Sequence, residues 1–403
     1  MASTSTNIDA STQPAPAVET GRLLVSLPLL ANGELHATLA NLAAAFPERT
    51  ILVATPSSLE GSASPAPDTL HLLAYTPTAA SAISWILTAA DYVNAFRLAE
   101  ENQATACLLL GAESQSIAPE ALRALAESVL HADADLAIAH YDTGLRELLV
   151  NSGILYPVSR ALFAARPRFP LAIDLALSLR MAGKLAATAQ KFISLNQNDA
   201  LIWPVAEAAS VNYTIAEIEI GPRTMPQPAA SDLNSLLAQI AGSLFAEVDA
   251  KAAFWQRARG TQPARLFPLS ALPAEAADIT PMLDAFRLAY TNLHGIWSLV
   301  LPPNSLLGLK RLSIMPAESF HMPDNLWARI VYDFILAYRL RTINRGHLLG
   351  ALTPLYLAWV ASHLVLVRSG TAPEKHIQDL AAAFETDKPY LVSRWRWPDR
   401  FNP

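Results

Sequence analysis

The sequence predicts an α/β domain followed by an all-helical domain, and three observations support this prediction. Short apolar runs alternate with longer amphipathic segments in the first part of the chain. After Gly221 three prolines interrupt the sequence within 222–228, and only helix-like segments follow. With 403 residues, 52% of them hydrophobic, the chain is long and apolar enough for two cores. We expect domains at 21–228 and 229–403, after a disordered Ser/Thr/Ala/Pro-rich tail at 1–20.

Five apolar runs in the first domain have the length and composition of buried strands. They lie at 22–27, 50–54, 70–75, 106–110 and 134–140. Helices are expected between them, at 33–45, 79–103 and 119–131. Asn32 is the expected cap of the first helix. Such alternation is typical of a parallel, doubly wound sheet, whose ligands bind beyond the carboxyl ends of the strands. The loops after Leu27, Ala54 and Leu110 are therefore the informative ones.

The second domain is predicted from apolar positions at helical spacing, separated by proline-containing connections. The expected helices lie at 232–259, 280–299, 323–340, 345–367 and 373–384. The stretch 346–367 has no formal charge and is long enough to span a bilayer. It also contains two histidines, a proline and hydroxyl side chains, which favours a buried core helix over a membrane span. We therefore expect no transmembrane span.

Composition argues against several other classes of protein. The net charge is −6 and no Lys/Arg stripe stands out, so no nucleic-acid partner is expected. A single thiol, Cys107, cannot form an intramolecular disulfide or a cysteine-based zinc site, and its apolar surroundings predict burial. The first residues lack the pattern of a secretory signal, so we expect a cytoplasmic protein.

Four stretches carry a resemblance to a known family. They are 151–162 (NSGILYPVSRAL), 326–334 (LWARIVYDF), 347–357 (HLLGALTPLYL) and 388–395 (KPYLVSRW). Together with the strand order, they resemble a bacterial family of GT-A glycosyltransferases related to glucosylglycerate and mannosylglycerate synthases. The resemblance covers nearly all residues after Gly21. It implies a Rossmann-like GT-A domain and the transfer of a sugar from a nucleotide-diphosphate sugar to a small, glycerate-like acceptor, with retention at the anomeric carbon.

The resemblance also implies a metal site. In such enzymes an Asp-x-Asp pair follows the fourth strand and holds a divalent cation, which neutralises charge on the leaving diphosphate. Here the two positions hold Gly111 and Glu113, and a later histidine position holds Met225. A thioether is a poor ligand for a hard cation. Glu113 is therefore the candidate ligand for Mg²⁺ or Mn²⁺ at a degenerate site.

Other site residues follow from the same resemblance. The loops after the first two strands supply Pro28, Thr55 and Ser57 as candidate donor-binding residues. Asp174 matches an acidic position facing the acceptor pocket, and Asp199 matches an acid near the acceptor, so both are candidate catalytic residues. Taken alone, Asp199 reads equally well as a helix N-cap and Asp174 as a polar residue at a helix start.

Some residues receive a structural interpretation. Asp133 and Asp135 look like a metal motif but come one helix too late, and a turn is expected there. His140 is placed where it could line the cleft. Trp395 and Trp397 are expected to pack the last segment onto the helices.

Two hypotheses of function remain open. The first is an active hexosyltransferase. The second is a pseudo-enzyme that keeps the fold, has lost the donor site and acts as a binding or regulatory partner. Gly111, Met225 and the loops at 55–58 and 76–80 all depart from the family pattern, which motivates the second hypothesis. A homo-oligomer is compatible with either.

Overall fold

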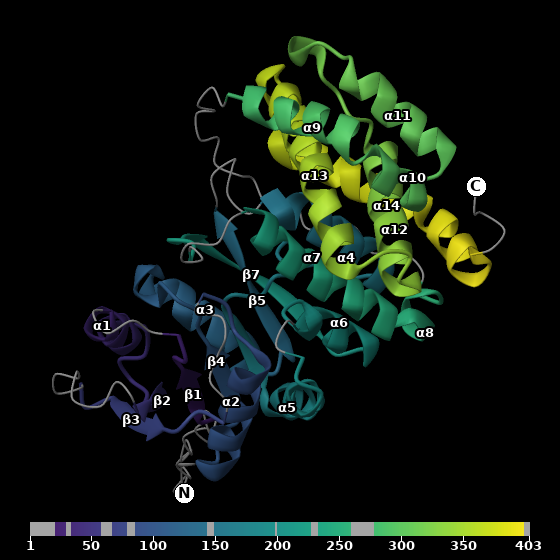
Figure 1. Ribbon diagram of the computed structural model, residues 1–403. Helices are drawn as coiled ribbons and strands as arrows, with labels where there is room; N and C mark the ends of the chain where they lie inside the picture. Colours follow the sequence, from purple (N-terminus) through teal and green to yellow (C-terminus); the bar gives the residue numbers. More distant parts are fainter. Residues whose placement is uncertain are drawn as a thin grey trace, which may run out of the picture.

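The computed structural model describes residues 21–29, 34–57, 67–78, 85–142, 149–197, 200–226, 233–258 and 278–398. The predicted tail at 1–20, the expected cap Asn32 and the candidate catalytic residue Asp199 lie outside these described residues. An α/β portion precedes an all-helical portion, and Figure 1 shows the two packed side by side. The predicted order of architectures is therefore confirmed.

The α/β portion is built on one seven-stranded sheet. Its strands are β1 (Leu23–Ser26), β2 (Ile51–Pro56), β3 (Leu70–Tyr75), β4 (Ala106–Leu109), β5 (Leu136–Asp142), β6 (Leu175–Ser178) and β7 (Ile215–Pro222). The strand order is β3-β2-β1-β4-β6-β5-β7. The five apolar runs predicted as strands correspond to β1 to β5, and the sequence prediction did not include β6 and β7.

The sheet is mixed, so the prediction of a wholly parallel sheet is wrong. Strand β6 runs antiparallel to both of its neighbours, β4 and β5, whereas the other pairs are parallel. The reason lies in the connection after β5: helix α4 (Tyr156–Phe163) packs against the helical portion, and the chain enters β6 from the edge at which it left β5. A mixed sheet with helices on both faces fits the GT-A type that the resemblance implies.

Helices cover both faces of the sheet. One apolar cluster joins α1 (Leu35–Ala45) and α3 (Pro119–Leu130) to one face. Another joins α2 (Ala89–Glu101) and α5 (Leu179–Ser194) to the opposite face. Strand residues alternate between these clusters, as side chains of a strand must. Helices α4 and α6 (Trp203–Ser210) of this portion also contribute to the second cluster.

Helix α2 begins later than predicted. Residues 85–88 are not helical, and the helix starts at Ala89 rather than at 79. The Asp91 carboxylate accepts hydrogen bonds from the Thr88 backbone N–H (2.7 Å) and hydroxyl (2.9 Å), so this capping box sets the start. Residues 79–84 lie outside the described part of the chain.

The helical portion follows from residue 233 onward. Its helices are α7 (Leu233–Ala250), α8 (Ala252–Trp255), α9 (Thr280–Asn292), α10 (His294–Val300), α11 (Pro303–Ser313), α12 (Asp324–Leu340), α13 (Arg345–Arg368) and α14 (Pro373–Arg396). Helix α14 continues through Pro389, beyond the predicted end at 384, because packing against α12 supports it. The Tyr332 hydroxyl, for example, donates to the Phe384 carbonyl at 2.7 Å. Helix α11 was not predicted.

Helix α13 is the uncharged stretch that was predicted as a core helix. Its length and composition would allow it to cross a membrane, and 67% of its most apolar window is buried within the structure. Leu352 and Trp359 have no exposed surface. This burial is what the core-helix prediction requires.

The two portions share a hydrophobic core. The cluster beneath α2 and α5 continues without interruption into α12, α13 and α14. Trp327 of α12 donates its indole N–H to the Gly153 carbonyl at 2.8 Å, and Arg160 of α4 lies 3.0 Å from Glu385 of α14. The predicted border at 228/229 thus marks a change of architecture, and its role as a domain boundary stays a prediction.

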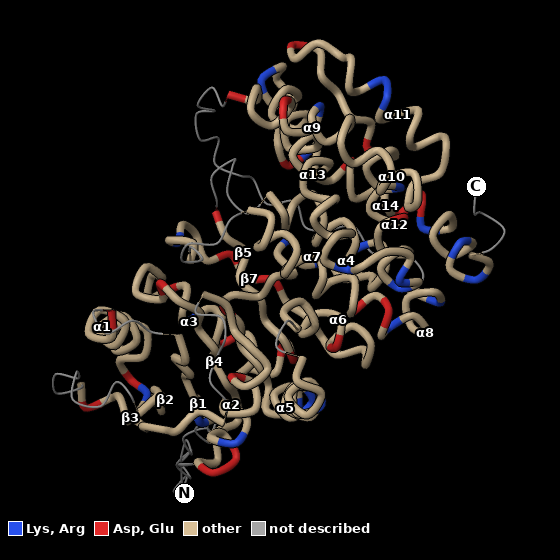
Figure 2. Tube along the Cα trace, viewed as in Figure 1, with Lys and Arg blue, Asp and Glu red and all other residues tan. Residues whose placement is uncertain are grey.

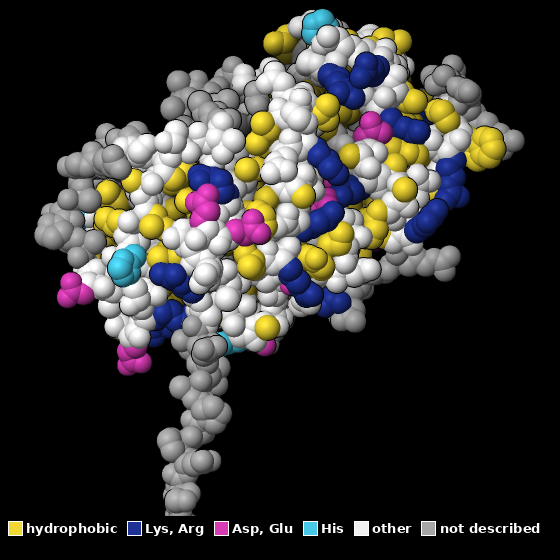
Figure 3. Space-filling view, turned by 90° about the horizontal axis from the view of Figure 1, so that it is seen from below, with side chains coloured by type: hydrophobic (Ala, Val, Ile, Leu, Met, Phe, Trp, Pro, Cys, Tyr) yellow, Lys and Arg dark blue, Asp and Glu magenta, His cyan; other side chains and the backbone are white. Residues whose placement is uncertain are grey.

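Charged residues are unevenly distributed. In Figure 2 the traces of β1, β2 and β4 carry no charged residue, which matches their buried sequences. On the face shown in Figure 3, Lys and Arg side chains gather toward the side of the helical portion and are interspersed with hydrophobic ones. The overall net charge of −6 does not reveal this local excess.

Candidate active site

The predicted donor-binding loops meet at one edge of the sheet. Strand β1 pairs in parallel with both β2 and β4, so the carboxyl ends of the three strands are adjacent. Pro28 follows β1, Thr55 lies near the end of β2 with Ser57 just beyond it, and Glu113 follows β4. Thr55 is buried, and the other three are half-buried. Their common location is as predicted, and their binding roles stay predictions.

The loop after β4 is tightly folded. Glu113 has a left-handed backbone (φ 61°) and precedes a short 3₁₀ turn at Ser114–Ser116. Its carboxylate accepts a hydrogen bond from the Gln115 amide at 2.9 Å, and its carbonyl accepts one from the Ser116 hydroxyl at 2.7 Å. A left-handed conformation costs a non-glycine residue roughly 1–2 kcal/mol, so surrounding contacts must hold this loop.

Asp174 lies at the centre of these contacts and has no exposed surface. Its Oδ1 accepts the Gly111 backbone N–H at 3.0 Å and Arg223 Nη2 at 3.0 Å. Its Oδ2 accepts the Tyr141 hydroxyl at 3.1 Å and lies 2.7 Å from Arg223 Nε. Both oxygens are therefore bonded to protein groups. The catalytic role of Asp174 stays a prediction, and in this structure its carboxylate binds the loop and Arg223.

Arg223 was not identified as a site residue from the sequence. Its side chain has no exposed surface and lies after β7, close to the loop that follows β4. Besides Asp174 it donates to the Ala112 carbonyl at 2.6 Å and to the Thr224 carbonyl at 2.9 Å. No spacing rule distinguishes a buried arginine from an exposed one. The available signal was that Arg223 lies two residues before Met225, where the resemblance implies a metal-binding histidine.

His140 and Tyr141 lie in the core rather than along an open cleft. The His140 Nδ1 lies 3.2 Å from the Glu217 carboxylate, and only 6% of the residue is exposed. Tyr141 is fully buried and also accepts the Asp174 backbone N–H at 3.1 Å. Burial, followed by the nearby Asp174 carboxylate, raises the pKa of Tyr141 well above its usual value, so its hydroxyl remains a donor. The expectation that His140 lines the cleft is therefore wrong.

The position of the missing first carboxylate is closely packed. A Cβ atom built on Gly111 would lie 2.6 Å from the Cγ2 of Ile173 and 3.0 Å from its carbonyl oxygen. Ile173 is itself buried. An aspartate cannot enter position 111 unless residue 173 moves.

The described residues do not fit a divalent cation. They contain no group of three His, Cys, Asp or Glu side chains placed to bind a metal. Near the loop after β4, Asp174 is bonded to Arg223, and Met225 is buried in the core. Within the described loop 110–118, Glu113 is the one carboxylate, whereas the pattern that the resemblance implies has two carboxylates and a histidine.

Asp135 has the structural role that the sequence favoured. It is buried, accepts the Ser178 hydroxyl at 3.0 Å and the Thr214 backbone N–H at 3.1 Å, and pairs with Arg180. The hydrogen bond from Arg180 is the main cause of the lowered pKa of Asp135. This aspartate therefore ties together the starts of β5, α5 and β7.

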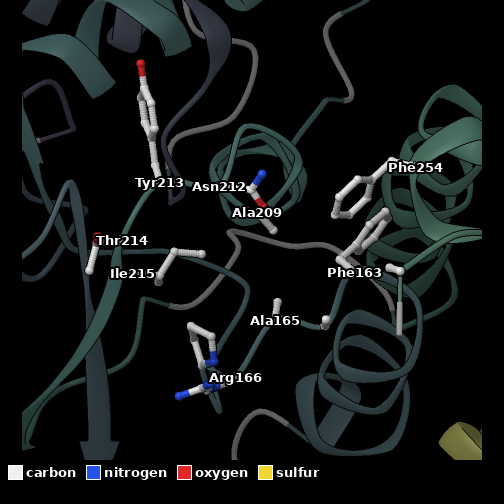
Figure 4. A pocket seen from close by; sticks show the side chains of 12 residues that line it. Phe163, Ala165, Arg166, Ala209, Asn212, Tyr213, Thr214, Ile215 and Phe254 are labelled. Atoms are coloured by element: carbon white, nitrogen blue, oxygen red, sulfur yellow. The ribbon is translucent and has the colours of Figure 1, made fainter. Parts of the chain in front are cut away.

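One cavity lies away from these loops. It has a volume of about 570 Å³, and Figure 4 shows that both apolar side chains (Phe163, Ile215, Phe254) and polar ones (Arg166, Asn212, Thr214) line it. Ile215 pairs with Leu136, so the cavity lies at the amino ends of β5 and β7. None of the candidate site residues that the structure describes lines it.

Comparison with known proteins gives a limited result. No family model and no curated protein matches this chain. Among solved structures, glucosyl-3-phosphoglycerate synthase from Mycobacterium tuberculosis, in complex with Mn²⁺, UDP and glucosyl-3-phosphoglycerate, is similar over 57% of this chain and 79% of its own. The identity is 12% and the TM-score 0.35.

A second structure of the same synthase, with Mn²⁺, UDP-glucose and phosphoglyceric acid, is similar over 61% of this chain and 88% of its own. The identity is 14% and the TM-score again 0.35. Identity and scores this low establish neither family membership nor activity for this chain.

Proposed function

We propose that this protein is a glycosyltransferase that moves a hexosyl group from a nucleotide-diphosphate sugar to a small hydroxylated acceptor resembling glycerate, with retention. The observation that carries the proposal is the meeting of the loops after β1, β2 and β4 at the carboxyl edge of a sheet of GT-A type. The family-like stretches in the sequence support it. We place the reaction in the cytoplasm, and a homo-oligomer is compatible with it.

The proposed roles of Pro28, Thr55, Ser57 and Asp174 follow their positions, and that of Asp199 follows from the resemblance. Pro28, Thr55 and Ser57 contact the donor at the loops after β1 and β2. Asp199 orients the acceptor hydroxyl. Asp174 acts through the loop that it binds, because a direct sugar contact would require breaking its pair with Arg223.

A pseudo-enzyme is the second candidate, and one observation favours it. The carboxylate proposed to face the acceptor pocket is fully buried and has both oxygens bonded, as described for Asp174. A chain with this arrangement can keep the fold and serve as a binding or regulatory partner without transferring a sugar.

Thermal unfolding against a panel of nucleotide-diphosphate sugars tests the proposal. A ligand at 100 times its dissociation constant stabilises the folded state by about 2.7 kcal/mol. We expect an upward shift of the midpoint with one donor, and release of nucleotide when glycerate or phosphoglycerate is added. Binding without turnover would support the pseudo-enzyme, and no shift with any donor would contradict the proposal.

A pair of variants localises the binding. Ser57→Trp places a bulky side chain at the half-buried loop after β2 and should remove the ligand-induced shift. Ser319→Trp, at an exposed position in the helical portion, should retain it. Equal loss in both variants would show that the shift does not report on this loop.

A further inference from the structure

We infer that the loop after β4 is fixed by Arg223 at the place where the resemblance implies a divalent cation, and that nucleotide binding at this edge is therefore independent of divalent cations. Arg223 is a positioning residue in this scheme. It holds the loop and does not touch the ligand, because its side chain is fully buried. The part that concerns the nucleotide rests on the proposed function.

The first support is the set of groups that Arg223 binds. Its guanidinium bonds the Ala112 carbonyl at 2.6 Å, within the tripeptide that takes the place of the metal-binding pair. The same group bonds both oxygens of Asp174, which in turn accepts the Gly111 N–H. A planar guanidinium presents several donors in a fixed geometry, which suits a role in holding a loop. The loop thus has an internal cation with a matched internal anion.

The clamp extends to the far end of the loop. The Thr224 backbone N–H donates to the Ser116 hydroxyl at 3.1 Å, and that hydroxyl donates to the Glu113 carbonyl at 2.7 Å. Arg223 and Thr224 therefore hold the loop from Ala112 to Ser116 by hydrogen bonds. These internal hydrogen bonds support the left-handed conformation of Glu113.

The second support is the packing at Gly111. A Cβ atom there would meet Ile173 at 2.6 Å, so the loss of the first carboxylate and the presence of this isoleucine belong together. Ile173 precedes Asp174, the partner of Arg223. The missing carboxylate, the bulky neighbour and the buried pair are therefore one rearranged unit rather than separate losses.

The nucleotide test compares two conditions. UDP is titrated into the protein by calorimetry, once in excess EDTA and once in 1 mM Mn²⁺. We expect dissociation constants that agree within about twofold. A dissociation constant more than tenfold weaker in EDTA would overturn cation independence while leaving the proposed function standing. Absence of UDP binding in both conditions would count against the proposed function, and the two tests below then decide the inference.

Mn²⁺ binding has a readout that needs no nucleotide. Adding wild-type protein should leave the electron paramagnetic resonance signal of free Mn²⁺ unchanged, and adding the Glu113→Gln variant should do the same. A loss of signal that shows one bound ion per chain, abolished in Glu113→Gln, would overturn the inference.

A double-mutant cycle tests the rearranged unit itself. Gly111→Ala adds only a Cβ atom, and we expect it to lower the thermal midpoint by roughly 5 °C through overpacking. In an Ile173→Ala background, Gly111→Ala should lower the thermal midpoint by less than half as much, because the effects of substitutions at residues in contact are not additive. An equal cost in both backgrounds, or no cost in wild type, would show that Gly111 and Ile173 are not coupled.

Discussion

The indole nitrogen of Trp327 donates a 2.8 Å hydrogen bond to the carbonyl of Gly153, and this bond joins the helical portion to the α/β portion. Gly153 also faces Trp359, whose ring atoms would lie 2.4–2.7 Å from a Cβ atom built on the glycine. The absence of a side chain at 153 is therefore what allows two tryptophans of the helical portion to approach this segment.

Replacing Gly153 with alanine should destabilise the protein. The added methyl group would overlap the Trp359 ring, and overpacking of this kind costs about 1–3 kcal/mol. Urea denaturation measures the difference. Gly295→Ala is the matched control, because nothing lies within 4 Å of a Cβ atom there. The control lies in α10 and should stabilise slightly, by roughly 0.5–1 kcal/mol. Equal effects of the two variants would contradict this view of Gly153.

Breaking the Arg223–Asp174 pair from one side should be strongly destabilising. Arg223→Met leaves a buried, uncompensated carboxylate, and such changes cost about 3–5 kcal/mol. The double variant Arg223→Met/Asp174→Leu should recover part of this loss because no buried charge remains. Denaturant unfolding at pH 7 provides the values. In contrast, Arg97→Ala removes an exposed pair with Glu101 and should change stability by less than about 1 kcal/mol. If Arg223→Met lowered the unfolding free energy as little as Arg97→Ala does, Arg223 would not have the proposed role of holding the loop.

His363 should make the fold sensitive to acid. Its Nδ1 lies 2.7 Å from the Nδ1 of His376, whose Nε2 lies 3.1 Å from Asp324. Burial, then the neighbouring His376 and Arg168, lowers the pKa of His363 to about 3. The unfolded chain therefore binds a proton at His363 between about pH 6.5 and 3 that the folded chain does not.

This contribution to stability is complete above about pH 6.5 and is lost as the pH falls, by up to about 1.4 kcal/mol per unit. Unfolding free energies of wild type and His363→Leu, measured from pH 7 to pH 4, isolate the effect. The unfolding free energy of the variant minus that of wild type should increase as the pH is lowered. A constant gap would rule out titration of His363 as the cause.

Glu247 should have the opposite effect on the pH dependence of stability, because its contribution is lost as the pH rises. Burial is the main reason that its pKa is raised to about 7, and nearby Glu207 adds to the effect while Lys251 opposes it. The folded chain keeps this proton between about pH 4.5 and 7, so the stability it contributes is lost as the pH rises through this range. The free energy of unfolding of Glu247→Gln, relative to that of wild type, should therefore increase by roughly 2–3 kcal/mol between pH 5 and pH 8. Parallel stability profiles of the two proteins would contradict this expectation.

The strands that the sequence predicted are those whose apolar runs are bounded by turn-forming residues, such as Ile51–Pro56. Strand β6 has only four residues within a longer apolar stretch, which periodicity cannot separate from a helix. Its direction depends on how α4 packs, and no local pattern contains that information. In β7, Ile218 and Ile220 alternate with Glu217 and Glu219, so a signal for this strand was present in the sequence.

The candidate site could be located but not completed from the sequence. Parallel strands bring their carboxyl ends together, which correctly placed Thr55 and Glu113 at one edge. The burial of Arg223 depends on contacts between segments about 50 and 110 residues apart, so it could not be predicted. The burial of tryptophans was also predicted only in part. Trp395 packs onto the helices as expected, whereas 61% of Trp397, for which packing was also expected, is exposed.

The core shared by the two portions bears on how such a chain can change in evolution. The cluster beneath α2 and α5 includes buried residues of the helical portion, among them residues of α7, α12, α13 and α14. An exchange of the helical portion with that of a distant relative would replace one wall of this core and leave the other unchanged. We therefore expect the two portions to diverge together, with changes at Gly153 and at Trp359, whose ring lies 2.4–2.7 Å from a Cβ atom built on Gly153, accepted only in compatible pairs.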